Sequence, residues 1–250
     1  MKAIIVAAGM GRRLNPYTDD RPKCMVPVAG KPILERQVDA LRAHGVHDVA
    51  VVRGYLGDRI TVPGLRFFDN PRYRENNILA SLMYAASELD EDFVFSYSDI
   101  VFHPDVVGTL LETAGEGALV VDRQWMRAYE GRTEHPVPEA ELTRVENGRI
   151  TRVGKRAVPA ELAAGEFIGL ARFSGAIGRL MRDEFERLEQ ELGGGPFGNA
   201  PRFEVAYLTD MLNHLIEAHD TEFRPAFIDE QWREIDTTQD LERAERVISW

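Results

Sequence analysis

Short apolar runs alternate with segments of helical spacing through the first half of the chain, and this alternation constrains the fold most. A continuous apolar run rich in β-branched residues, KAIIVAA, occupies 2–8, and comparable runs lie at 48–54, 65–70, 92–102 and 117–123. Such runs are typical of strands that are buried on both faces. Because parallel strands need helical crossovers, this order predicts an α/β fold, with a mainly parallel sheet and helices on both faces.

Apolar residues at helical spacing separate the predicted strands. We expect helices from Pro32 onward, over 78–89 and around 106–113. The run at 92–102, DFVFSYSDIVF, is expected to form one strand with an acidic residue near its end. The predicted core of the first half therefore consists of buried strands covered by three helices.

The second half of the chain changes character. Asn147-Gly148 lies between two alternating segments, which is a strong signal for a β-hairpin. Two helices are expected to flank the glycine-rich loop at 193–202, the later one over 204–218. A strand end, a cap and an amphipathic helix are expected over 232–248. We expect a single domain in which a small antiparallel elaboration extends the α/β unit.

Composition narrows the classes of partner. The formal net charge is −11, and an acidic protein lacks the basic face that nucleic-acid phosphates require. No stretch approaches the roughly 20 apolar residues that cross a bilayer, so no membrane partner is expected. Cys24 is the only cysteine in the sequence, which excludes a disulfide within the chain. These features favour a cytoplasmic protein.

A glycine loop follows the first predicted strand, in the stretch AAGMGRRL at 7–14. It is not a Walker A loop, because no Gly-Lys-Ser/Thr ends it, and Leu14 stands where a dinucleotide fingerprint has its third glycine. A tight turn after a strand would have the same pattern. The arginines within the loop and Pro22-Lys23 beyond it favour phosphate binding, because these cations make charge-assisted bonds to phosphate.

This stretch resembles the signature of nucleotidyltransferases that join a nucleoside triphosphate to a phosphorylated small molecule. The matching residues are Ala7, Ala8, Gly9, Gly11, Arg13, Leu14, Pro22 and Lys23. The segments NPRYRENNILASL, FSYSDIVFHP, GEFIGLARFS and WREIDTTQDLERA extend the resemblance across nearly the whole chain. Ala8 and Ser98-Asp99 resemble the phosphocholine cytidylyltransferase-like branch, whereas sugar-nucleotide enzymes usually have Leu-Ala-Gly-Gly and Gly-Asp.

The resemblance implies a Rossmann-like three-layer sandwich of the glycosyltransferase-A type. Residues 1–122 would form the nucleotide half and 123–250 the acceptor half. The implied reaction transfers CMP from CTP to phosphocholine or to a phosphonate such as 2-aminoethylphosphonate, with Mg²⁺ or Mn²⁺ and release of pyrophosphate. The alternatives are a sugar- or polyol-1-phosphate nucleotidyltransferase and a non-catalytic nucleotide-binding regulator. A monomer or a homodimer is expected.

The resemblance and the residue types assign roles to individual side chains. Lys23 and Arg13 are the expected catalytic residues, and Asp99 and Asp236 are the expected metal ligands. The nucleotide is expected to contact Ala7, Ala8, Gly9, Gly11, Gly54, Asn77, Ser81 and Ser98. The acceptor is expected to contact Lys155, Glu166, Asp122, Trp125, Tyr129 and Trp232, and the aromatic residues among these would hold a quaternary ammonium group.

Several of these residues also have a purely structural interpretation. Asp236 and Asn77 each precede a predicted helix and are candidate N-caps, although the threonines after Asp236 could cap instead. The aromatic residues could belong to ordinary packing. His103 and His135 lie near the motifs, but neither has a second histidine at metal-ligand spacing, so no zinc site is expected. The long polar stretch at 125–141 is expected to gate a site or to be mobile.

Overall fold

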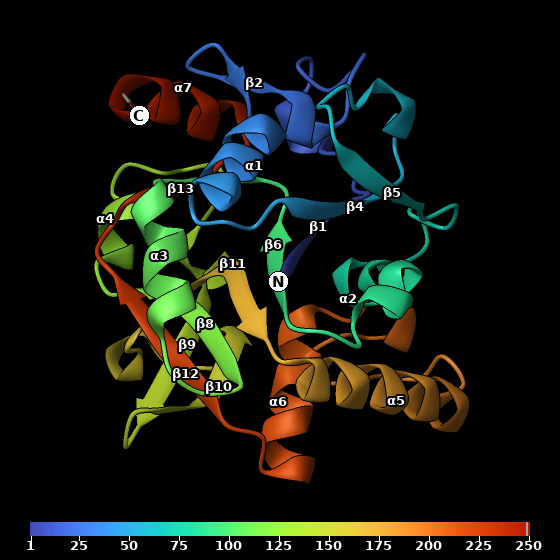
Figure 1. Cartoon of the computed structure of the whole chain (residues 1–250). Coiled ribbons are helices and arrows are strands. Elements are labelled where there is room, and N and C mark those ends of the chain that lie inside the picture. The colour runs from blue at the N-terminus through green and yellow to red at the C-terminus, as the bar shows by residue number, and fades with distance from the viewer. Residues whose placement is uncertain (249) are drawn as a thin grey trace.

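A nine-stranded mixed sheet forms the centre of the computed structural model, which describes residues 1–248 and 250 (Figure 1). The strand order is β5-β4-β1-β6-β11-β8-β12-β10-β9. The strands are β1 (Lys2–Ala7), β4 (Asp48–Arg53), β5 (Leu65–Asp69), β6 (Phe93–Tyr97), β8 (Gly117–Asp122), β9 (Glu141–Glu146), β10 (Arg149–Lys155), β11 (Gly165–Phe173) and β12 (Phe223–Ile228). Strands from both predicted halves of the chain therefore share one sheet.

The pairing of the strands is parallel in the first half and mixed in the second. β5, β4, β1 and β6 run parallel to one another, and β12 runs parallel to β8. β11 is antiparallel to both β6 and β8, and β9 and β10 form the predicted antiparallel hairpin. At the hairpin turn, Asn147 and Gly148 have φ values of 51° and 74°, which suit a type I′ turn.

Helices cover both faces of the sheet, which confirms the predicted α/β fold. α1 (Ile33–Ala43) and α3 (Pro104–Glu112) pack on the face that carries Ala3 and Ile5 of β1. Ile4 and Val6 point to the other face, where they join α2 (Ile78–Leu82), α5 (Gly175–Leu192) and α6 (Leu208–His219) in a second cluster. Figure 1 shows α5 and α6 next to each other at one end of the molecule. The alternation of β1 side chains thus builds two cores on one sheet.

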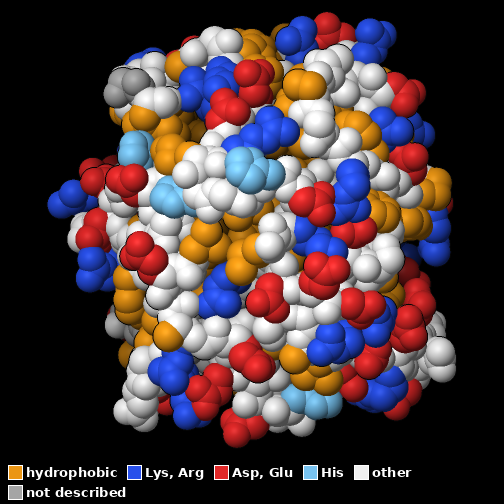
Figure 2. All heavy atoms as spheres, in the orientation of Figure 1, with side chains coloured by type: hydrophobic (Ala, Val, Ile, Leu, Met, Phe, Trp, Pro, Cys, Tyr) orange, Lys and Arg blue, Asp and Glu red, His pale blue; other side chains and the backbone are white. Residues whose placement is uncertain are grey.

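The remaining elements lie around the C-terminal segment of the chain. β7 (Ile100–Phe102) pairs antiparallel with β13 (Trp232–Glu234), and β2 (Pro27–Val28) pairs with β3 (Lys31–Pro32). α4 (Trp125–Tyr129) lies within the polar stretch, and α7 (Thr238–Val247) is the last helix. No helix among the residues described here is long and apolar enough to cross a membrane. Figure 2 shows acidic and basic side chains interspersed over one face of the molecule.

Three predicted elements are wrong in detail. The run at 92–102 is not one strand, because the chain turns at Ser98-Asp99 and β7 leaves the large sheet to pair with β13. The helix expected over 78–89 changes to a 3-10 helix after Leu82. The helix expected from Glu204 begins at Leu208, after a separate 3-10 turn. Of these three differences, the turn at Ser98-Asp99 lines the cavity described next.

Candidate active site

A cavity of about 430 Å³ opens beside the glycine loop and the carboxyl ends of β1 and β6. Crevices at this edge of an α/β sheet are the usual ligand sites of such folds. The residues that line it come from the glycine loop, from the start of α2, from the β6–β7 turn, from the hairpin, from β11 and from the C-terminal segment. The cavity therefore joins both halves of the sequence.

Lys23 lies between the two predicted metal ligands. Its Nζ is 2.9 Å from Oδ2 of Asp99 and 2.7 Å from Oδ1 of Asp236, and its side chain is 11% exposed. Burial alone would lower the pKa of the Lys23 ammonium, but the carboxylates of Asp99 and Asp236 raise it above its usual range. The structure thus brings together three residues that are up to 213 positions apart.

Asp236 has two further partners. The Arg13 guanidinium lies 2.5 Å from its Oδ2, and Nδ1 of His135 lies 3.0 Å from the same oxygen. Burial would raise the pKa of Asp236, yet Lys23, His135 and Arg13 together hold it well below its usual range. The Asp236 carboxylate is therefore ionised at neutral pH and is surrounded by cations or hydrogen-bond donors.

Local structure frees the Asp236 side chain from a capping role. Thr237 is the N-cap of α7, since its Oγ1 accepts a hydrogen bond from the backbone N–H of Asp240 at 3.2 Å. The Asp240 carboxylate in turn accepts from the backbone N–H of Thr237 at 2.9 Å, which completes a capping box. β13 carries Asp236 to the cavity, because the Ile235 N–H donates to the Asp99 carbonyl at 2.7 Å.

The two oxygens of the Asp99 carboxylate differ in their contacts. Its Oδ2 binds Lys23, whereas its Oδ1 is buried and has no hydrogen-bond partner among the residues that the structure describes. Buried polar atoms without partners are uncommon, and they often face a ligand, an ion or a water molecule. Carboxylate oxygens are also the ligands that Mg²⁺ prefers. The donor set of Asp99 and Asp236 therefore fits a hard divalent cation.

The glycine loop approaches Lys23 closely. Gly11 has a φ of 59°, and a Cβ atom there would lie 2.9 Å from Cβ of Lys23. Ala8, Gly9 and Gly11 line the cavity, and a Cβ at Gly9 would meet open space. Ala7 does not line the cavity, because its side chain belongs to the α1 side of the core. The Ala7 side chain thus has a packing role, and the expected contact of its backbone with the nucleotide stays a prediction.

Gly54 does not line the cavity but packs closely against the backbone of the glycine loop at Ala8. A Cβ at Gly54 would lie 2.8 Å from the Ala8 carbonyl oxygen and 2.7 Å from Cβ of Tyr73. The same carbonyl accepts a hydrogen bond from the Tyr55 N–H at 3.1 Å. Gly54 thus permits a close approach between β4 and the loop, and a larger residue would displace the loop.

Asn77, Ser81 and Ser98, which we expect to contact the nucleotide, line the cavity. Asn77 occupies the N-cap position of α2, but its side chain makes no capping hydrogen bond, and its Nδ2 donates to the Val205 carbonyl at 3.3 Å. Ser81 is buried and accepts a hydrogen bond from Nδ2 of Asn70 at 2.9 Å. Asn70 follows β5 directly and supports Ser81 without lining the cavity, a role that the sequence analysis did not predict.

Carboxylates concentrate at the acceptor end of the cavity. Burial raises the pKa of Glu141 to about 7 and that of Glu166 to about 8. Glu141 accepts a hydrogen bond from the Tyr97 hydroxyl at 3.1 Å, and Oε2 of Glu166 has no partner. Lys155 is the only lysine at the acceptor end of the cavity among the described residues. Its Nζ lies 3.0 Å from Oε2 of Glu139.

The structure corrects part of the predicted acceptor set. Asp122 does not line the cavity, because its carboxylate accepts from the Gln124 and Glu230 N–H groups and from Nε1 of Trp232. Trp125 is 4% exposed and packs in a small separate cluster with Tyr129, so neither ring lines the cavity. Their apolar surroundings explain the packing role.

The predicted aromatic wall is therefore built differently. Trp232 lines the cavity, together with Tyr73, Tyr97 and Tyr207. Tyr129 still acts on the site indirectly, because its hydroxyl donates to Oε1 of Glu166 at 2.6 Å. The three lining tyrosines were missed because nothing in their local sequence separates them from tyrosines elsewhere in the chain.

The polar stretch at 125–141 also contributes residues that the sequence analysis missed. His135 is 2% exposed and contacts both Asp236 and Glu234. Arg132 binds Asp240 at 2.6 Å and Glu234 at 2.8 Å. This segment, expected to gate the site or to be mobile, is thus tied to α7 and to β13. No periodicity or spacing in the sequence signals these ion pairs.

Comparisons with known proteins show the family and the fold of the chain. Residues 3–166 match the MobA-like NTP transferase domain. The chain is 34% identical to the CTP:phosphoglutamine cytidylyltransferase of Campylobacter jejuni, over 97% of this chain and 98% of that protein. It is 36% identical to the choline-phosphate cytidylyltransferase of Streptococcus pneumoniae over 41% of this chain and 46% of that protein. The fold is similar to a solved CTP:phosphocholine cytidylyltransferase from Streptococcus pneumoniae, with a TM-score of 0.74, 21% identity and 98% coverage of each chain.

Proposed function

The chain belongs to the family of MobA-like NTP transferase domains and is a nucleotidyltransferase, and we propose that it transfers CMP from CTP to a small phosphorylated acceptor. The position of Lys23 carries this proposal, because its ammonium lies under the glycine loop and between Asp99 and Asp236. The full-length similarity to a phosphoglutamine cytidylyltransferase supports CTP as the nucleotide.

The proposed chemistry is an in-line displacement at phosphorus. An anionic oxygen of the acceptor attacks the α-phosphorus of CTP, the bond to the bridging oxygen breaks, and pyrophosphate leaves. The attacking oxygen is already deprotonated, so no general base is required. Catalysis then depends on holding two anions together and on stabilising charge that develops on the phosphoryl oxygens. Lys23 and Arg13 supply positive charge for both tasks.

Asp99 and Asp236 would hold a Mg²⁺ ion, or Mn²⁺ in its place. The bound ion would neutralise charge on the triphosphate. For the ion to bind, the Lys23 ammonium must leave the space between the two carboxylates. Its flexible stem allows the ammonium to turn from the carboxylates toward a phosphate oxygen. Lys23 would thus exchange an aspartate partner for a substrate partner when the nucleotide enters.

The acceptor is proposed to carry an ammonium group in addition to its phosphate or phosphonate. Glu139, Glu141 and Glu166 line this end of the cavity, and an ammonium group beside Glu141 and Glu166 would favour their ionised forms over the protonated forms that burial favours. The Tyr207 ring already lies 5.1 Å from the Lys155 ammonium. Carboxylates and aromatic faces both attract an ammonium group. Phosphocholine and 2-aminoethylphosphonate, expected from the sequence, meet this description. Phosphoglutamine also meets it through its amino-acid head group.

A substrate panel tests the proposal. Pyrophosphate release would be followed with CTP and phosphocholine, 2-aminoethylphosphonate or phosphoglutamine, and with UTP, dTTP or GTP and sugar-1-phosphates. We expect turnover with CTP and at least one acceptor that bears an ammonium group. Turnover with sugar-1-phosphates alone would establish the alternative acceptor class instead. Binding of CTP without turnover of any acceptor would establish a nucleotide-binding regulator.

A further inference from the structure

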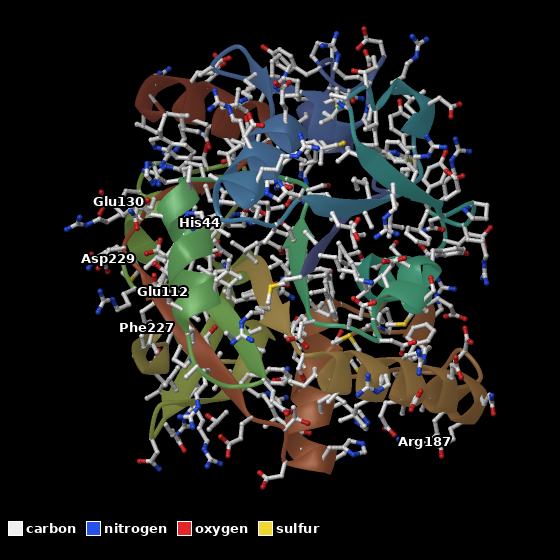
Figure 3. All side chains as sticks on the ribbon, viewed as in Figure 1. His44, Glu112, Glu130, Arg187, Phe227 and Asp229 are labelled. Atoms are coloured by element: carbon white, nitrogen blue, oxygen red, sulfur yellow. The ribbon has the colours of Figure 1, made fainter. Side chains whose placement is uncertain are left out.

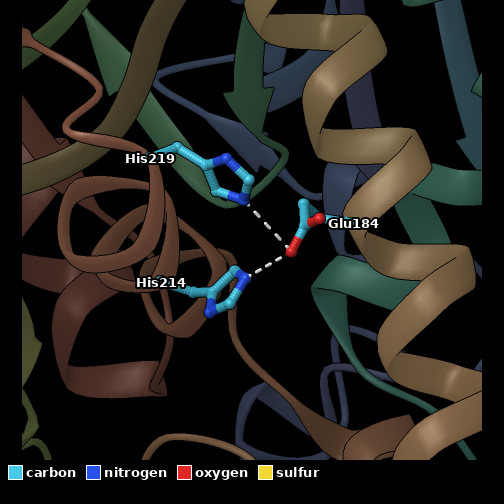
Figure 4. A group of neighbouring side chains, drawn as sticks. All are labelled: Glu184, His214 and His219. Atoms are coloured by element: carbon cyan, nitrogen blue, oxygen red, sulfur yellow. Dashed lines mark hydrogen bonds and ion pairs between the residues drawn. The ribbon is translucent and has the colours of Figure 1, made fainter.

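Two histidines and one glutamate meet on the side of the molecule formed by α5 and α6 (Figure 4). Nε2 of His214 lies 2.6 Å from Oε2 of Glu184, and Nε2 of His219 lies 3.3 Å from the same oxygen. Figure 4 shows both imidazole rings directing a nitrogen toward this carboxylate. None of the three residues lines the catalytic cavity.

We propose that Glu184, His214 and His219 form a binding site for a transition-metal ion, with Zn²⁺ as the preferred occupant. Imidazole nitrogen and carboxylate oxygen are the ligand atoms that Zn²⁺ takes. The three ligand atoms all lie within 4.8 Å of one another. This inference is independent of the proposed function, because it uses residues outside the cavity.

The distances between the ligand atoms suit a tetrahedral ion after a small adjustment. With metal–ligand bonds of about 2.0–2.1 Å, neighbouring ligand atoms of a tetrahedral site lie about 3.4 Å apart. The separation between His219 and Glu184 already has this value, and His214 would need to withdraw by roughly 0.8 Å. Side-chain rotation is sufficient for such a change, because the His214 and His219 side chains are 18% and 32% exposed.

The surroundings prepare the carboxylate for a metal. Nε of Arg187 donates to Oε1 of Glu184 at 3.1 Å, and Oε2 is the oxygen toward the histidines. Figure 3 shows Arg187 at the outer side of α5. Nη2 of Arg187 also lies 2.7 Å from Oε2, while Nη1 lies 2.5 Å from Glu191. For Oε2 to bind an ion, Nη2 of Arg187 must withdraw, while its Nε can stay with Oε1 and its Nη1 with Glu191. Partners outside the ligand set commonly orient metal-binding carboxylates in this way.

Such an ion would fasten α6 to α5. Glu184 belongs to α5, His214 to α6, and His219 is the last residue of α6. The opposite end of α6 follows Tyr207, which lines the catalytic cavity. The three side chains would supply three ligands of a four-coordinate ion. Because His219 is partly exposed, a water molecule could supply the fourth ligand. The site would stabilise the packing of the two helices, since no substrate-binding residue takes part.

Zinc binding by the whole protein tests this inference. Chelator-treated protein would be dialysed against graded Zn²⁺, and bound metal measured, with Mg²⁺ and CTP saturating the catalytic cavity. We expect His214→Gln and His219→Gln each to weaken the affinity for one Zn²⁺ at least tenfold. His47→Gln is the matched control, because His47 is an exposed histidine remote in sequence from the cluster, and it should bind Zn²⁺ as the wild type does. Equal affinity and stoichiometry in all four proteins would overturn the site.

A measurement on the unaltered protein keeps the test valid if a variant folds poorly. Diethylpyrocarbonate modifies exposed imidazoles, and mass spectrometry locates the modified residues. Zn²⁺ should protect His214 and His219 and leave His47 reactive. Protection that is the same for all three histidines, or absent at His214 and His219, would refute the proposal. Zn²⁺ should also raise the Tm of the wild type and of His47→Gln more than that of His214→Gln.

Discussion

Replacing Lys23 with methionine would leave two carboxylates facing each other without their shared cation. Methionine keeps the length and apolar stem of lysine and removes only the charge. Asp236 would keep Arg13 and His135 as partners. Asp99 would keep no ion-pair partner among the residues that the structure describes. The variant therefore isolates the cost of an unpaired, partly buried Asp99 carboxylate.

The expected loss of stability follows from the burial of this group. Removing one partner of a buried ion pair costs about 3–5 kcal/mol. The Asp99 side chain is 27% exposed and Asp236 keeps two partners, so we expect the lower end, about 3 kcal/mol. In a protein of this size, about 1 kcal/mol changes the Tm by roughly 2–4 °C, so the Tm should fall by roughly 6–12 °C. Scanning calorimetry in EDTA measures this change.

A matched control and a metal titration complete the test. Lys31→Met removes an exposed lysine that pairs with Asp39, and surface pairs contribute only about 0–1 kcal/mol. Mg²⁺ should raise the Tm of Lys23→Met more than that of the wild type, because the ammonium no longer competes for the oxygens of Asp99 and Asp236. Cytidylyl transfer should fall roughly 10²–10³-fold. An unchanged Tm in EDTA, or equal Mg²⁺ shifts in both proteins, would refute the reasoning.

Three further changes address the cap, the loop and the acceptor wall. Thr237→Ala removes the N-cap of α7 and should cost about 1 kcal/mol in urea unfolding. Gly54→Ala places a Cβ 2.8 Å from the Ala8 carbonyl, so calorimetric CTP affinity should fall and stability should decrease by about 1–3 kcal/mol. Burial raises the pKa of Glu166 from 4.5 to about 8. Between these pH values the folded protein keeps a proton that the unfolded chain releases, so the free energy of unfolding falls as the pH rises. Glu166→Gln should flatten the Tm–pH curve over this range.

Local sequence patterns account for the central strands and fail where distant segments pair. The run at 3–8 is apolar at every position, and β1 indeed places Ile4 and Ile5 in different cores. The run at 92–102 has the same character, yet it breaks at Ser98-Asp99. The break exists because Phe102 pairs with Trp232, 130 residues later. A rule based on local periodicity contains no information about that partner.

The same distinction separates the site residues that could be predicted from those that could not. Lys23 and Asp236 each belong to a short motif whose residue types suggest phosphate or metal binding, and both reach the cavity. His135 comes from a polar stretch without a motif and is buried only because it packs against Asp236. Asp122 illustrates the opposite error, since a carboxylate at a strand end also serves to bind Trp232. The fold decides between these roles.

The acidic composition and the proposed metal requirement have a common physical basis. Six carboxylic side chains line the cavity, against the four cations Arg12, Arg13, Lys23 and Lys155. A triphosphate entering such a cavity would meet net repulsion unless part of this charge is removed. Burial does so for Glu141 and Glu166 by raising their pKa values to about 7 and 8. Four carboxylic side chains, those of Asp99, Glu139, Glu234 and Asp236, then face the four cations. A divalent ion at Asp99 and Asp236 would add positive charge and would release Lys23 to the phosphates, so the metal makes this carboxylate-rich cavity favourable for an anionic substrate.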